Sequence, residues 1–189
     1  MNDTDMRVQA ARTAVDGFKV VERIYRHAYQ TLMVLKDRIK EDLNLKVESP
    51  LRNNAINTSD PSSWIFKFRG LFLSASKIAL EEYKNRQVPV LFLQVSLHNS
   101  NGREPLIRYG VIDKIFNMST YKGARFDDYF RMILTELHAE SSAETVKASH
   151  CEAIVRFDEK PLLDIREDSD VADLGREISE KYGPALLVS

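Results

Sequence analysis

The sequence predicts an α+β fold: a mainly antiparallel sheet of about four to six strands, with helices on one side and a long amphipathic N-terminal helix. Apolar residues recur every three or four positions from Ala11 to Ile39, within a helix predicted over residues 1–46. Two apolar runs on either side of residues 100–102 alternate like the strands of a hairpin. The predicted organisation is therefore a helix over 1–46, a loop over 47–63 and a single α+β domain over 64–189.

The N-terminal helix carries a continuous apolar seam. Its steps of three and four residues are those of an a/d heptad pattern, sustained over about four heptads. The seam consists of Ala11, Ala14, Phe18, Val21, Tyr25, Ala28, Leu32, Leu35 and Ile39. About 35 helical residues span roughly 50 Å, which exceeds the diameter of a small domain. We therefore expect part of the seam to find no partner within its own chain.

Two interpretations of this helix compete. In the first, it lies across the sheet of its own domain and the seam is core. In the second, it pairs with the same helix of another chain, most simply as a dimer, or with a helix of a partner protein. Val15 and Val20 widen the apolar surface, so one helix could do both. The expected interaction residues are Phe18, Val21, Tyr25, Leu32, Leu35 and Ile39. The pattern leaves the number and orientation of paired helices open.

The clearest sheet element is a hairpin around Ser100-Asn101-Gly102, whose glycine suits a left-handed loop position. Matching the two apolar faces pairs residues whose numbers sum to 202, because a slip of one residue would bury the polar set. One face then pairs Leu91, Leu93 and Val95 with Val111, Tyr109 and Ile107. The other pairs Gln94 with Arg108 and His98 with Glu104, and sets Phe92 over Gly110.

The other elements are predicted from shorter patterns. Prolines, asparagines and serines mark residues 47–63 as loop, and a strand follows over 64–74. Residues 77–86 fit either a helix or a strand. A helix is expected over 125–140, a strand over 151–157 with a possible returning strand over 161–165, and a last helix over 170–181. Tyr182-Gly183-Pro184 is expected to end that helix.

Composition narrows the functional classes. The chain has 27 basic and 28 acidic residues, a net charge of −1, which weighs against a nucleic-acid-binding protein. Its single cysteine, Cys151, rules out an intramolecular disulfide and favours a reducing compartment. No secretory signal and no apolar run of membrane-spanning length is evident. We therefore expect a cytoplasmic protein that does not enter the membrane.

One pattern suggests a metal-dependent nuclease or phosphodiesterase. Asp158-Glu159-Lys160 ends an apolar strand, and an acid-x-Lys pair in that position can hold a divalent cation and activate water. Asp113 is the candidate second carboxylate, since it interrupts an apolar strand face. Pro161 favours the simpler interpretation, a charged connection between two short strands.

A second weak candidate is the polar face of the hairpin, where Gln94, His98 and Arg108 could bind a small ligand or simply face water. The histidines do not cluster, and His27 is expected to be exposed. His150 and Cys151 are adjacent, but neighbouring strand residues point to opposite faces. We therefore expect Cys151 to be a core residue and not a nucleophile.

These observations favour a cytoplasmic, non-enzymatic interaction or scaffold protein that self-associates through its N-terminal helix. No cofactor and no metal is expected. A metal-dependent nuclease or phosphodiesterase, and a small-ligand-sensing module, are the two alternatives.

Overall fold

The computed structural model describes residues 3–45, 47–52, 68–74, 88–96, 104–119, 126–137 and 143–187. The described strands form one antiparallel, six-stranded sheet in the order β1-β2-β3-β4-β6-β5. Their bounds are β1 Val47–Arg52, β2 Phe68–Ser74, β3 Val90–Ser96, β4 Leu106–Phe116, β5 Ala143–Ala148 and β6 Cys151–Pro161. Among the described helices, none is long and apolar enough to cross a membrane. The predicted α+β class, the antiparallel sheet and the long N-terminal helix are confirmed.

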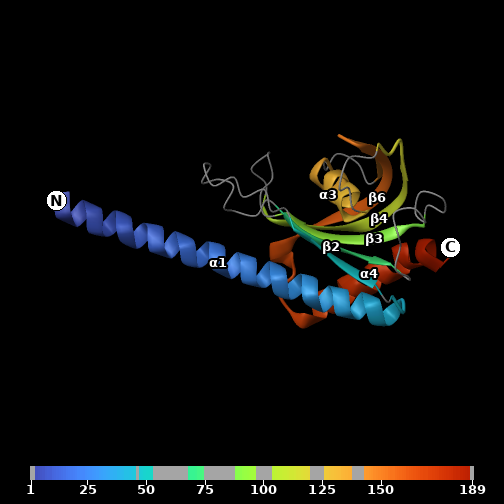
Figure 1. Cartoon of the computed structure of the whole chain (residues 1–189). Helices are drawn as coiled ribbons and strands as arrows, with labels where there is room; N and C mark the ends of the chain where they lie inside the picture. Colours follow the sequence, from blue (N-terminus) through green and yellow to red (C-terminus); the bar gives the residue numbers. More distant parts are fainter. Residues whose placement is uncertain are drawn as a thin grey trace.

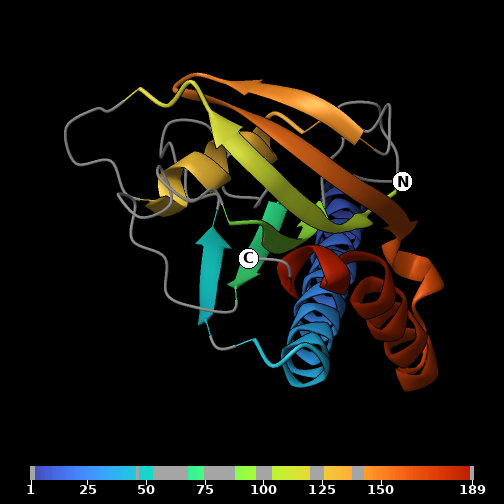
Figure 2. The same cartoon turned by 90° about the vertical axis from the view of Figure 1, so that its right-hand side faces the viewer.

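Helices cover both faces of the sheet, not one side as predicted (Figures 1 and 2). The C-terminal part of α1 (Asp3–Asp42) and α4 (Asp168–Leu187) lie side by side on one face. The shorter α3 (Phe126–Thr135) packs on the other face. Both faces of the central strands are apolar, with Leu91 and Leu93 under α1 and α4, and Phe92 under α3. A sheet that is apolar on both faces needs a helical layer on each.

The predicted hairpin register is confirmed. Leu91 pairs with Val111, and Gln94 with Arg108, so that the paired numbers sum to 202. Gly110 faces Phe92 as expected, but a different neighbour explains its missing side chain. A Cβ at Gly110 would lie 2.1 Å from the carbonyl oxygen of Arg156 on β6. Position 110 is therefore restricted to glycine by the close approach of β6. The pairs that involve Leu97 and His98, and the whole of 77–86, lie outside the described residues.

Three short elements differ from the predictions. Residues 47–52 form an edge strand instead of loop, and an edge tolerates Pro50 because one side of the strand needs no ladder partner. Residues 143–148 form a strand that the polar sequence did not suggest, joined to β6 by a turn at 149–150. β6 continues to Pro161, which pairs with Leu106, and a 3-10 helix over Leu162–Asp164 replaces the returning strand.

α4 also continues past its predicted end, through Pro184 to Leu187. Two glycines of α4 lie where this helix packs against α1. A Cβ at Gly175 would lie 2.9 Å from Cδ of Arg38, and one at Gly183 would lie 2.7 Å from Cδ2 of Leu43. Both glycines therefore allow α4 to approach α1 closely. The tertiary contact outweighs the local helix-ending signal of Gly-Pro.

Candidate functional site

The N-terminal half of α1 projects away from the rest of the molecule (Figure 1). All described side chains from Met6 to Arg23 are exposed. Phe18 is 76% exposed and Val21 is 40% exposed, although both belong to the predicted seam. An exposed phenylalanine among other exposed apolar side chains is typical of a surface that contacts another protein.

The C-terminal half of the same seam is core. Leu32, Leu35 and Ile39 are at most 1% exposed and pack against the sheet and α4. Tyr25 is half-buried at the boundary, and Ala28, at 5% exposure, is the first fully buried seam residue. Asn44, in the left-handed conformation (φ 51°), ends the helix, with the Leu45 amide donating to the Lys40 carbonyl. The first interpretation is therefore confirmed for the second half of the helix, which is intrachain core, whereas none of the described residues covers the first half.

The exposed apolar surface of α1 is wider than the seam. Its large members, from 40% to 76% exposed, are Met6, Val15, Phe18, Val20, Val21, Tyr29 and Val34. The polar side of the projecting half carries ion pairs of Asp16 with Lys19 and of Glu22 with Arg26. Such exposed pairs contribute little to stability but keep that side hydrated. At 3.6 residues per turn, Phe18 and Val21 lie on the seam, whereas Val20 and Val34 lie on the opposite side of the helix, so apolar side chains are exposed on two sides.

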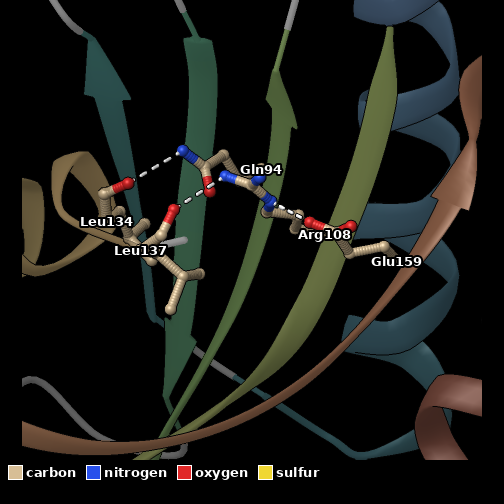
Figure 3. Close-up of polar contacts among 5 residues, drawn as sticks. All are labelled: Gln94, Arg108, Leu134, Leu137 and Glu159. Carbon is tan, nitrogen blue, oxygen red and sulfur yellow. Dashed lines mark hydrogen bonds and ion pairs between the residues drawn. The ribbon is translucent and has the colours of Figure 1, made fainter. Parts of the chain in front are cut away.

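The polar face of the β3–β4 hairpin is buried, not wet, because α3 ends on it (Figure 3). Gln94 is 1% exposed and Arg108 is 7% exposed. Nε2 of Gln94 donates to the carbonyl of Leu134 (3.1 Å), and an Arg108 nitrogen donates to that of Leu137 (3.1 Å). Leu134 lies in the last turn of α3, where carbonyls lack intrahelical donors, and Leu137 lies two residues beyond the helix, so the two side chains hold the C-terminal end of α3 against the sheet.

Glu159 of β6 completes this cluster. Nε of Arg108 forms an ion pair with Oε1 of Glu159, which lies opposite it in the β4–β6 register. Within the described residues, Oε1 of Gln94 is buried without a hydrogen-bond partner. The donors of Gln94 and Arg108 that would contact a ligand are occupied by α3 and Glu159, so this cluster holds the fold together in the structure. His98, the third predicted ligand residue, lies outside the described residues.

The three nuclease candidates are not brought together. Asp158 and Lys160 share a face of β6, but both Nζ of Lys181 (2.6 Å) and Oη of Tyr182 (2.8 Å) donate to Asp158. Asp113 accepts two hydrogen bonds of 2.6 Å from Arg156. The register partner of Asp158 is Tyr109, which lies four residues from Asp113 along β4. That separation is roughly 13 Å of strand, too far for the two carboxylates to share one ion.

Each acidic candidate has its own cation in the structure instead. Among the described side chains, no group of three or more His, Cys, Asp or Glu is arranged to hold a metal ion. Asp113 lies at an irregularity of the β4–β6 ladder between Ile112 and Lys114, which explains why a charged residue interrupts an apolar strand. The sequence shows that Asp113 interrupts an apolar strand face, but the irregularity of the β4–β6 pairing at that point depends on tertiary structure and could not be predicted from it.

Two tyrosines fasten α4 to the sheet. Oη of Tyr109 donates to Glu177 (2.9 Å), and Oη of Tyr182 donates to Asp158. Burial first, and then these carboxylate hydrogen bonds, raise the pKa of Tyr109 and the pKa of Tyr182 well above the usual range of a phenol. Neither phenol is therefore suited to act as a base near neutral pH.

The structure shows the surroundings of the Cys151 thiol and of the imidazoles of His150 and His27. Cys151 is 3% exposed, and burial raises the pKa of its thiol to about 11. Nδ1 of His150 lies 3.0 Å from the hydroxyl of Ser119, in the turn before β6. His27 is half-buried, not exposed as expected, with Nε2 3.3 Å from the Leu162 carbonyl. His138 lies outside the described residues.

Comparison with protein-family models, with curated proteins and with solved structures finds no match for this chain. Function must therefore be inferred from the chain's own geometry. Most of the exposed large apolar side chains of the described residues lie on α1, and Phe18 is the most exposed of them.

Proposed function

We propose that this protein is a cytoplasmic, non-enzymatic assembly protein that self-associates through the projecting half of α1. The exposure of Phe18 at a seam position carries the proposal, since the same seam is fully buried two turns beyond Tyr25. Covering Phe18 in an interface would add the free energy of burying a large apolar side chain, which the exposed helix lacks. The single, buried Cys151 is consistent with a reducing compartment.

Mutation of the exposed seam tests this proposal. Phe18→Glu combined with Val21→Glu places two charges in the expected interface without touching the core. We expect sedimentation velocity at tens of micromolar to give a dimer for the native chain and a monomer for this variant. Leu32→Glu is not suitable, because Leu32 is 1% exposed and a charge there would unfold the body.

The matched control is Gln9→Glu combined with Thr13→Glu, which adds the same charge away from the seam. Gln9 and Thr13 are exposed in the projecting half. The control should remain dimeric, and circular dichroism should show equal helicity for all three proteins. A native chain that sediments as a single chain, or a seam variant that remains dimeric, would refute the proposal.

A further inference from the structure

We infer that the two copies pair in antiparallel orientation, in a register where facing seam residues have numbers that sum to about 32. This inference rests on the proposed self-association and adds its orientation and register, which the seam alone left open.

The position of the body relative to the seam argues against a parallel pair. Val21 lies on the same side of α1 as Leu32 and Ile39, because all three belong to one seam. Leu32 and Ile39 are buried against the sheet and α4, so the body fills the space beside the seam from Ala28 onward. In a parallel pair, the partner's residues 28–42 would have to occupy that same space. In an antiparallel pair, the partner's residues 28–42 and its body lie at the opposite end of the exposed seam.

The length of the free seam fits the antiparallel pair. When the a positions of one helix face the d positions of the other, residue 4 lies opposite Ala28. Ala28 is the first seam residue that the body buries. The pairing therefore covers the seam of both chains from residue 4 up to the point where each body begins to bury it.

Side-chain sizes give a second, independent argument. The free seam begins with Ala11 and Ala14 and continues with Phe18 and Val21. The antiparallel register sets Ala14 against Phe18, so each of these layers contains one small and one large residue. A parallel register would stack Phe18 on Phe18 and Ala14 on Ala14. Because the distance between helix axes depends on the side chains in contact, the parallel helices would have to diverge.

Charge favours the same orientation. Arg7 is the next seam position before Ala11, so a parallel pair would place Arg7 of one chain against the same residue of the other. The antiparallel register sets Arg7 opposite Tyr25, and an aromatic face attracts a guanidinium.

Disulfide trapping with Ala11→Cys and Val21→Cys tests the orientation. These exposed positions face each other in the antiparallel register, whereas position 11 of one chain lies about 15 Å along the axis from position 11 of the other. A disulfide needs Cα atoms within about 7 Å. Under mild oxidation, we expect a covalent dimer when the two single variants are mixed and none when either is alone. The native chain, with only the buried Cys151, and Gln9→Cys are the blanks.

The outcomes separate the two proposals. Covalent dimers in each single variant alone, and not preferentially in the mixture, would establish a parallel pair and overturn this inference while self-association stands. A native dimer that gives no covalent product in the mixture would overturn the register. A native chain that is monomeric by sedimentation would instead refute the proposed function itself.

Discussion

Phe18 and Leu32 occupy equivalent positions two heptads apart on the seam of α1, yet Phe18 is 76% exposed and Leu32 is 1% exposed. The difference arises because the helix is longer than the body that it packs against. One periodic pattern thus contains a core-forming half and a half that no described residue covers. The exposure of each half decides what a mutation there should change.

Truncation of these two residues should have opposite consequences. Leu32→Ala should lower the free energy of unfolding by about 2–5 kcal/mol, because it opens a cavity in the core. Phe18→Ala should leave the urea midpoint of the dilute, monomeric protein unchanged and weaken only association. Equal destabilisation by the two changes would show that the projecting half packs on the body.

Gly110→Ala should destabilise the sheet by about 3 kcal/mol or more, because the new Cβ would lie against the backbone of β6. Gly17→Ala is the matched control. No atom lies within 4 Å of a Cβ at Gly17, so alanine should stabilise the helix by up to about 1 kcal/mol. Thermal unfolding by circular dichroism would measure both effects, and a tolerated Gly110→Ala would contradict the β4–β6 contact.

Arg108→Met should cost about 3–5 kcal/mol, since it removes a donor to α3 and leaves the largely buried charge of Glu159 without its partner. Gln94→Met should cost only about 1 kcal/mol or less, because it removes one hydrogen bond together with a buried acceptor that has no partner. Chemical unfolding of the two variants would compare them. If Gln94→Met lowered the free energy of unfolding by clearly more than about 1 kcal/mol, Oε1 of Gln94 would have a partner such as a bound water.

Cys151 should react with a thiol reagent at pH 8 only when the protein unfolds, because its thiol is buried and its pKa is raised to about 11. The same shift has a stability consequence. The folded state keeps the proton that the unfolded thiol loses from about pH 9, so this contribution is complete below pH 9 and falls as pH rises toward 11. Rapid labelling of the folded chain would contradict the burial of Cys151.

The sequence predicted the features that depend on regular periodicity. The hairpin register followed from Leu91 and Val111 on one face and from Gln94 and Arg108 on the other, since only one register keeps both faces consistent. The length of α1 followed from its seam, and with it the expectation of an uncovered part. The predicted boundary of residue 46 lies close to the observed end at Asp42.

Features that depend on tertiary contacts could not be predicted in this way. The sequence alone favours a water-facing position for Gln94 and Arg108. In the structure, α3 and the residues that follow it cover both side chains. The Gly183-Pro184 pair is a local signal for a helix end, yet α4 continues to Leu187 with Gly183 packed against Leu43. The point where the seam changes from exposed to buried, near Tyr25, is fixed by where the sheet lies and has no signal in the pattern itself.

The mass of the native chain in solution tests the central claim most directly. Light scattering coupled to size-exclusion chromatography, over a concentration series up to tens of micromolar, should give a species of twice the chain mass of 21.7 kDa. Dilution should shift it toward the single-chain mass. A single-chain mass at every concentration would contradict the account, since the exposed side of α1 would then have no second copy to cover it.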